Sequence, residues 1–169
     1  PVISAILDRI GVSSGDSVLD VGCGTGILVP HLEKRGVKNM RAIDLSPEMV
    51  KEYLKKYPGR AVIAGDYEEA GLFAQESFSK IIIYNAFPHF ERRKAVFDNS
   101  YGYLKPGGVL YILHSMSRAE LDRLHREAGE EVAEHMLYSN AGFRQLYAGA
   151  GFENIAVDDG AKFFAKGHK

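Results

Sequence analysis

Short apolar runs alternate with amphipathic segments along most of this chain. Runs of strand length occupy residues 18–21, 40–43, 60–64, 80–84 and 109–113. Between them, apolar positions recur every three or four residues, the period of a helix with one buried face. This period predicts helices over residues 1–10, 25–35, 46–57, 90–104, 117–129 and 141–150, and two last strands follow at 152–157 and 162–166. Strands that alternate with helices predict an α/β fold with a doubly wound sheet.

Three local patterns refine this outline. In the helix over residues 25–35, we expect Ile27, Leu28 and Leu32 to face the core. Residues 68–79 are polar and predict an irregular segment. Residues 105–108, Lys-Pro-Gly-Gly, predict a turn that leads into the fifth strand.

Size and charge narrow the class of protein. The 169 residues suffice for one domain with a substantial core. The net charge of −1 implies no broad attraction to nucleic acid or to an anionic membrane. No apolar run approaches the ~20 residues of a transmembrane helix, and no signal peptide is visible. Cys23 is the single cysteine, so no intrachain disulfide can form. We therefore expect a single-domain, cytoplasmic protein without membrane association.

The stretch Ser17 to Leu28, S-V-L-D-V-G-C-G-T-G-I-L, joins an apolar strand to a turn containing Gly22, Gly24 and Gly26. Glycine allows positive φ angles and close approach of the backbone to a ligand. A helix N-terminus after such a turn offers free N–H groups to a polar or anionic group. The loop therefore predicts a site for a nucleotide-like cofactor. A dinucleotide fingerprint, G-x-G-x-x-G, would need glycine where Ile27 stands, which disfavours NAD.

The sequence D-V-G-C-G-T-G, which begins at Asp20, resembles the first motif of the class I S-adenosylmethionine (SAM)-dependent methyltransferases. L-K-P-G-G-V-L at residues 104–110 and A-G-F at residues 150–152 are also typical of that family, and the resemblance covers nearly the whole chain. It implies a three-layer sandwich with strand order 3-2-1-4-5-7-6 and an antiparallel seventh strand. It also implies SAM as cofactor and S-adenosylhomocysteine (SAH) as product.

The resemblance implies that two acidic residues at strand ends bind the cofactor. Asp44 lies 18 residues after Gly26, where a carboxylate can accept hydrogen bonds from ribose hydroxyls. Asp44 is also placed to cap the helix opened by Ser46-Pro47-Glu48, and both roles can hold. Asp66 matches the residue that binds the adenine amino group, with an exposed turn aspartate as the alternative. The full expected cofactor set is Asp20, Gly22, Cys23, Gly24, Thr25, Gly26, Asp44, Leu45, Met49, Asp66, Tyr67, Asn85, Ala86 and Phe87.

Methyl transfer depends chiefly on positioning, and it needs a general base only where the acceptor atom is protonated. His89 follows the fourth strand and His114 ends the fifth, so each is a candidate base or substrate orienter. A bolder hypothesis gathers His114, His125 and His135 around a metal or an anionic substrate. These three lack a compact zinc-ligand spacing, and we predict no metal site.

The acceptor is the least defined part of the prediction. Residues 85–88 read N-A-F-P, so the D/N-P-P-Y/F signature of methyltransferases acting on planar nitrogens is absent, and a small-molecule acceptor is favoured over nucleic acid. About ten residues precede the first turn, which predicts an N-terminal lid that is short or trimmed. The alternatives are a SAM-binding sensor or subunit without catalysis and, less favoured, an NAD-dependent oxidoreductase. Whether the protein is a monomer or a homodimer stays open.

Overall fold

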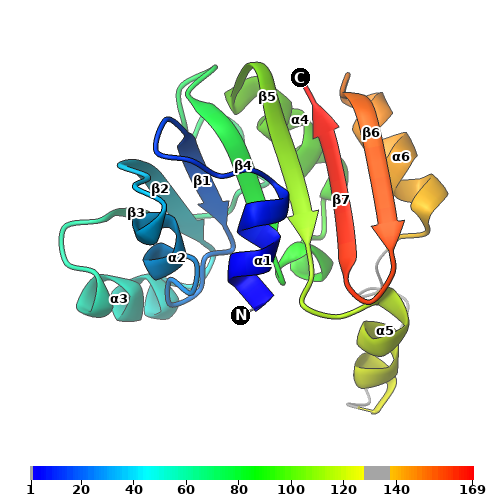
Figure 1. The fold of residues 1–169 in the computed structure, drawn as a ribbon, viewed down its shortest axis with the longest axis horizontal. Helices are drawn as coiled ribbons and strands as arrows, with labels where there is room; N and C mark the ends of the chain where they lie inside the picture. Colours follow the sequence, from blue (N-terminus) through cyan, green and yellow to red (C-terminus); the bar gives the residue numbers. More distant parts are fainter. Residues whose placement is uncertain (1, 128–137) are drawn as a thin grey trace.

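A sheet of seven strands forms the middle layer of the computed structural model, which describes residues 2–127 and 138–169 (Figure 1). The strands are β1 (Ser17–Val21), β2 (Asn39–Asp44), β3 (Ala61–Ala64), β4 (Phe78–Tyr84), β5 (Leu104–Leu113), β6 (Glu153–Asp159) and β7 (Phe163–His168). The helices are α1 (Val2–Arg9), α2 (Val29–Lys34), α3 (Pro47–Lys56), α4 (Arg93–Tyr103), α5 (Arg118–Glu127) and α6 (Asn140–Gly149), with a 3-10 turn, η1 (Phe87–His89).

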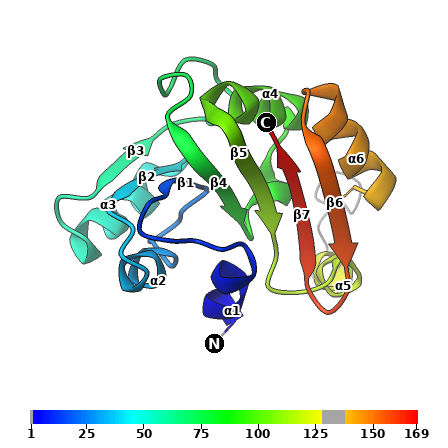
Figure 2. The ribbon, with the colours of Figure 1, turned by 45° about the horizontal axis from the view of Figure 1, so that its top comes forward.

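The strand order is β3-β2-β1-β4-β5-β7-β6, as the family resemblance predicts. The first five strands are parallel to one another, and β7 runs antiparallel to both β5 and β6. The β6–β7 pair closes one edge of the sheet, beside α6 (Figure 2). The predicted doubly wound sheet with an antiparallel seventh strand is therefore confirmed.

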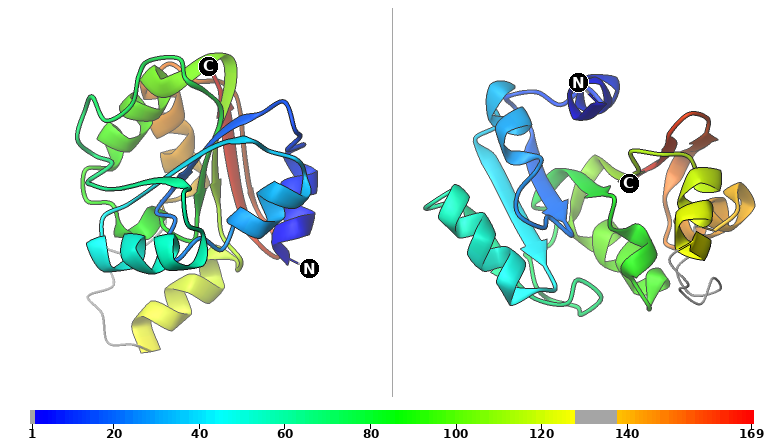
Figure 3. Two further views of the ribbon diagram at one scale, coloured as in Figure 1. Left: turned by 90° about the vertical axis from the view of Figure 1, so that its left-hand side faces the viewer. Right: turned by 90° about the horizontal axis from the view of Figure 1, so that it is seen from below.

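Successive residues of the central strands face opposite sides of the sheet, which explains their unbroken apolar runs. In β4, Ile81 and Ile83 join the core beneath α4 and α6, whereas Ile82 joins the core beneath α1 and α2. Figure 3 shows these two helix pairs on opposite faces. The α4–α6 side includes an edge-to-face contact between Phe97 and Tyr147, whose ring centroids lie 4.7 Å apart.

The parallel arrangement brings the carboxyl ends of β1, β2, β3, β4 and β5 to the same edge of the sheet (Figure 1). Ligands of open α/β sheets bind at this edge, in the crevice outside the strand ends. The loops that follow these strands are therefore where a binding site is expected. Across residues 2–127 and 138–169, no helix combines the length and the apolar character needed to cross a bilayer.

Helix α2 begins at Val29, four residues later than predicted from the apolar pattern. Gly26 has a φ of +86°, and the main-chain N–H of Gly26 donates to the Cys23 carbonyl, so tight turns continue through this stretch. Leu28 and Leu32 are buried as predicted, but Ile27 is 57% exposed, and the expectation that it faces inward is wrong. A residue in a turn does not follow the helical period that placed Ile27 on the inner face.

The turn predicted at residues 105–108 lies within β5 instead. Main-chain hydrogen bonds join Gly107 and Gly108 to Lys169, and the pairing register with β4 shifts beside Leu104. Lys169 thus pairs with this glycine-rich segment, and because Gly107 has a φ of +76°, the chain bends here as a bulge within the strand. The remaining predicted elements agree with the structure to within a few residues, and the predicted end of α5 at residue 129 lies outside the described residues.

Candidate cofactor site

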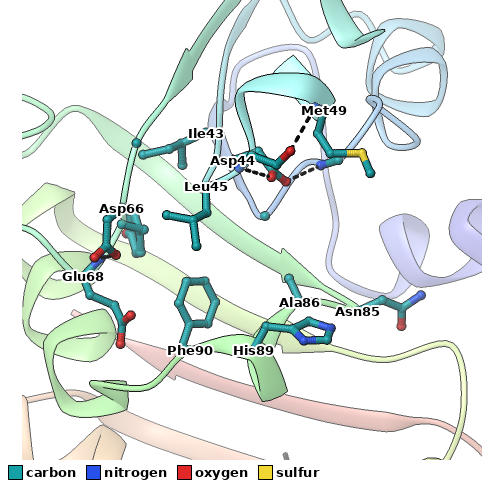
Figure 4. Close-up of a pocket in the computed structure, with 15 residues that line it drawn as sticks. Ile43, Asp44, Leu45, Met49, Asp66, Glu68, Asn85, Ala86, His89 and Phe90 are labelled. Atoms are coloured by element: carbon teal, nitrogen blue, oxygen red, sulfur yellow. Dashed lines mark hydrogen bonds between the residues drawn. The ribbon is translucent and has the colours of Figure 1, made fainter. Parts of the chain in front are cut away.

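A cavity of about 490 Å³ opens at the carboxyl edge of the sheet (Figure 4). Its volume lies within the usual range for small-molecule and cofactor sites, roughly 300–1,000 Å³. Its walls come from the segments that follow β1, β2, β3 and β4, and they comprise Gly22, Gly24, Ile43, Asp44, Leu45, Ser46, Met49, Gly65, Asp66, Tyr67, Glu68, Asn85, Ala86, His89 and Phe90.

The glycine loop forms one wall because its backbone lies against the segment after β4. Gly22 has a φ of +69°, a conformation that side chains rarely allow. A Cβ atom at Gly22 would lie 2.4 Å from the Cβ of Ala86, far inside van der Waals contact. The loop therefore requires glycine at this position both for its conformation and for its closeness to Ala86.

Asp44 binds the glycine loop to the start of α3. Its carboxylate accepts hydrogen bonds from the main-chain N–H of Gly24, at 2.7 Å, and of Ser46, at 3.0 Å (Figure 4). A carboxylate has about four acceptor positions, so two stay available to a ligand in the cavity. Ser46 is the N-cap of α3, and its hydroxyl accepts the N–H of Met49. Asp44 is therefore not itself the cap, the alternative that the sequence left open.

Apolar side chains line the cavity next to Asp44. Leu45 is 71% exposed and Met49 is 43% exposed, although both are large and hydrophobic. The ring of Phe90 faces Leu45 across the cavity (Figure 4). Apolar groups gathered in a concave site mark a surface that a ligand covers. The space between Leu45 and Phe90 suits a flat apolar ring.

Asn85 connects the ends of β4 and β5. Its φ of +55° lies in the left-handed region, which asparagine tolerates better than most residues. Its Oδ1 accepts the main-chain N–H of Ser115 at 2.8 Å, and its Nδ2 donates to the Ser115 hydroxyl at 3.1 Å. These bonds hold the strained backbone in place, so Asn85 presents a fixed surface to the cavity.

Asp20 lies in β1 and does not line the cavity. It is 3% exposed, and its Oδ2 has no hydrogen-bond partner within residues 2–127 and 138–169. Burial, and to a smaller extent the charge of Asp44, raise the pKa of Asp20 to about 7. Among the described residues, this carboxyl therefore lies beneath the glycine loop with one oxygen unpaired, where a negative charge is costly.

The structure brings most of the predicted cofactor residues together. Nine of them line the cavity: Gly22, Gly24, Asp44, Leu45, Met49, Asp66, Tyr67, Asn85 and Ala86. The other five, Asp20, Cys23, Thr25, Gly26 and Phe87, lie outside the lining. Cys23 and Phe87 are buried in the core. The Thr25 hydroxyl accepts a hydrogen bond from Lys56, and Gly26 packs closely against the rings of Tyr53 and Tyr57.

Sequence reasoning missed five lining residues: Ile43, Ser46, Gly65, Glu68 and Phe90. Each lies within two residues of one that was predicted. The strand-end position was therefore the signal that could have found them, since all the residues around a strand end approach the same crevice. The type of amino acid alone gave no signal, because isoleucine, serine and glycine occur throughout the fold.

The two candidate catalytic histidines lie in different places. His89, in η1, lines the cavity. His114 is buried and lines a separate cavity of about 190 Å³ between α1 and the start of β7. His125 falls within α5, and His135 lies outside the described residues. In the part of the chain that the structure describes, no group of three or more His, Cys, Asp or Glu side chains is arranged to hold a metal ion.

The strand order, the glycine loop after β1 and the carboxylate at the end of β2 define a Rossmann-like domain of the kind that binds nucleotide cofactors. Residues 19–112, more than half of the chain, match a family model described as a methyltransferase domain. The chain belongs to this family, the class I SAM-dependent methyltransferases, and SAM is the family's cofactor.

Individual relatives agree with this family. Phosphoethanolamine N-methyltransferase 1 of Triticum aestivum is 26% identical over 163 residues, which cover 90% of this chain and 31% of that enzyme. This chain thus spans about a third of that relative's length. A SAM-dependent methyltransferase of Mesorhizobium loti has the same fold, with a TM-score of 0.79, 16% identity, and coverage of 100% of this chain and 98% of that chain.

A third similar protein was solved with ligands. Phosphoethanolamine N-methyltransferase 2 of Haemonchus contortus, in complex with phosphomonomethylethanolamine and SAH, gives a TM-score of 0.76 at 22% identity. The similarity covers 92% of this chain and 38% of that chain. At this identity the likeness establishes a shared fold.

The contact between Gly22 and Ala86 gives a first prediction. The substitution Gly22→Ala adds a methyl group at a positive φ and 2.4 Å from the Ala86 Cβ, so we expect a loss of about 2–4 kcal/mol in unfolding free energy. Chemical denaturation measures this loss. Gly15→Ala is the control, because a Cβ there has nothing within 4 Å and its φ is not positive. Equal stability of the two variants would contradict the prediction.

The buried Asp20 gives a pH prediction. The folded protein raises the pKa of Asp20 from its ordinary 3.8 to about 7, so it binds this proton more tightly than the unfolded chain does. The stabilisation that the protonated Asp20 contributes to the folded state is fully present below the ordinary pKa of 3.8, and it is lost as the pH rises through 7. Between about pH 5 and about pH 8, the wild type should lose on the order of 2 kcal/mol relative to Asp20→Asn, which keeps the shape without the charge.

Denaturant titration of the cofactor-free protein across this pH range measures the difference. Asp98→Asn, at an exposed position of α4, is the control and should follow the wild type. A wild type and an Asp20→Asn variant with parallel stability profiles would show that Asp20 is not the titrating group.

Proposed function

We propose that this chain binds SAM in the cavity at the carboxyl edge of the sheet and transfers its methyl group to a small-molecule acceptor. The observation that carries this proposal is the order of groups along the cavity. A glycine loop comes first, then the Asp44 carboxylate with acceptor positions to spare, and then an apolar slot between Leu45 and Phe90. These suit, in turn, the amino-acid part, the ribose and the purine of one nucleoside cofactor.

The residues present fit each part of SAM. The glycine loop lets the amino-acid part approach the backbone, and the nearby unsatisfied Asp20 favours a cationic group at this end. Asp44 accepts hydrogen bonds from the two ribose hydroxyls. Asp66 faces the purine end, where a carboxylate can accept from an amino group. The remaining predicted residues, Cys23, Thr25, Gly26 and Phe87, support the site by holding the loop and the β4 segment in place.

The chemistry places modest demands on the protein. SAM, when bound, supplies an electrophilic methyl group. The chain's own residues must then hold an acceptor atom in line with that group and exclude competing water. His89 lies on the wall formed by the segment after β4, and we infer that it orients the acceptor or takes its proton. His114 lines the other cavity, so its catalytic role stays a prediction.

Three observations support a small-molecule acceptor. The relative from T. aestivum is named phosphoethanolamine N-methyltransferase, and the phosphoethanolamine in that name is a small molecule. Residues 85–88 lack the N-P-P-Y/F type of signature, and the net charge of −1 provides no surface attraction for nucleic acid. We also infer that residues 1–169 act as one domain and that the protein works in the cytoplasm.

Calorimetric titration tests cofactor binding. The wild type should bind SAM and SAH saturably and should not bind NAD. Asp44→Asn should weaken SAM binding by about tenfold or more, because charge-assisted hydrogen bonds to ribose contribute about 1.5–3 kcal/mol each. Asp158→Asn, on β6 away from the cavity, is the control and should bind like the wild type. Wild-type protein that binds NAD but not SAM or SAH would refute the proposal.

Turnover tests the role of His89. After screening with methyl-labelled SAM has identified an acceptor, His89→Ala should lower kcat by about 10²-fold or more, the usual contribution of a positioned acid or base. Its affinity for SAM should change little. His31→Ala, on α2 and outside the cavity lining, is the control. Unchanged turnover in His89→Ala would remove His89 from the mechanism, and SAM binding without transfer to any acceptor would favour a sensor or subunit.

A further inference from the structure

The purine end of the cavity lies between two walls that one arginine connects. Residues 65–68, after β3, form one wall, and the other wall comes from the segment after β4, through Asn85, Ala86, His89 and Phe90. Arg92 follows the second wall by two residues. We propose that Arg92 is a positioning residue that aims the Asp66 carboxylate at the cofactor's purine ring and thereby makes the site select a 6-amino purine.

The contacts of Arg92 span both walls. Its Nη2 donates to Asp66 Oδ2 at 3.0 Å and to Glu69 Oε1 at 2.6 Å. Its main-chain N–H donates to the Glu68 carboxylate. Asp66 and Glu68 both line the cavity and appear together at its edge in Figure 4. One residue therefore contacts the three carboxylates that follow β3.

The backbone of this loop is held by other residues. Asn99 donates its Nδ2 to the carbonyl oxygens of Tyr67, at 2.9 Å, and of Glu69, at 3.1 Å. The Tyr67 hydroxyl makes a buried hydrogen bond with the Ser100 hydroxyl at 2.9 Å. These bonds join the loop to α4 without Arg92. What Arg92 adds is the orientation of the charged side chains.

Charge explains why that orientation needs a cation. Asp66, Glu68 and Glu69 lie within four residues, so without a partner their carboxylates repel one another and turn toward water. Arg92 is 53% exposed, and exposed ion pairs add little to folding stability. The planar guanidinium can donate to two carboxylates at once, which fixes direction as well as charge. Loss of Arg92 should therefore affect ligand selection more than stability.

This inference rests on the proposed function, which places the purine beside Asp66. A carboxylate there accepts a hydrogen bond from a 6-amino group but repels a 6-oxo group, whose oxygen is also an acceptor. One of the Asp66 oxygens is already held by the main-chain N–H of Glu68 at 2.9 Å. With Arg92 holding the other oxygen, the carboxylate plane is fixed and its unused acceptor positions can face the ligand.

The experiment compares SAH with S-inosylhomocysteine, its 6-oxo analogue, by calorimetry. The wild type should prefer SAH by about tenfold or more, the difference of one charge-assisted hydrogen bond. Arg92→Gln should reduce this preference about three- to tenfold, with its thermal midpoint within about 2 °C of the wild type. Arg92→Lys should fall in between, because an ammonium keeps the charge without the planar fork.

Lys94→Gln is the matched control. Lys94 is an exposed cation on α4 that pairs with Asp98, and its loss should leave the preference unchanged. Raising the ionic strength from about 0.05 M to about 0.5 M should lower the preference of the wild type but not that of Arg92→Gln, because salt screens exposed pairs.

Three binding results would overturn the inference: a wild type without preference, an Arg92→Gln variant with the wild-type preference, or equal weakening of both ligands. A wild type that binds neither ligand is a separate result, since that refutes the proposed function itself. A variant with a much lower thermal midpoint would show a structural role for Arg92 and also overturn the inference.

Discussion

The hydrogen bond from the Gly24 N–H to the Asp44 carboxylate, at 2.7 Å, holds the site together. It joins the loop after β1 to the end of β2, and the same carboxylate holds Ser46 at the start of α3. Three elements therefore meet at one side chain. Because β1 and β2 are adjacent parallel strands, the sheet brings these groups within reach before any ligand binds. The cavity is preorganised by the fold, which lowers the entropy that a ligand must lose on binding.

The fold could be predicted from sequence to an unusual extent because its signals are local. Unbroken apolar runs such as Ile81 to Ile83 mark strands covered on both faces, and glycine turns mark their ends. The strand order followed from the family resemblance rather than from the pattern. One error came where a tight turn at Gly26 interrupts the helical period, and the other came where a long-range contact is invisible to the local pattern. Lys169 pairs with Gly107 and Gly108 from the far end of the chain, and no local pattern at residues 105–108 reports this.

The sequence predicted the site only to within a few residues of each strand end. Asp44, Asp66 and Asn85 were found because they lie at or just after strand ends, whereas Phe90 and Glu68, each next to a predicted residue, were not included. Asp20 differs from these residues. It belongs to the motif that identifies the family, yet it lies in the core beneath the loop rather than on the cavity wall. Membership in a motif does not distinguish a residue that contacts the ligand from one that supports the loop.

The close approach of Gly22 to Ala86 has a consequence for how this domain can diversify. Position 22 has no side chain to trim, and position 86 has a methyl group that already fills the gap. Position 22 therefore cannot take a side chain unless a strand end moves, and this part of the cavity wall is restricted to glycine. Under the proposed function, acceptor preference can change at the rim instead, where His89 extends from the short turn η1. If the proposed function holds, the part of the wall next to the sheet is the more constrained one, and the turn that carries His89 is the freer one.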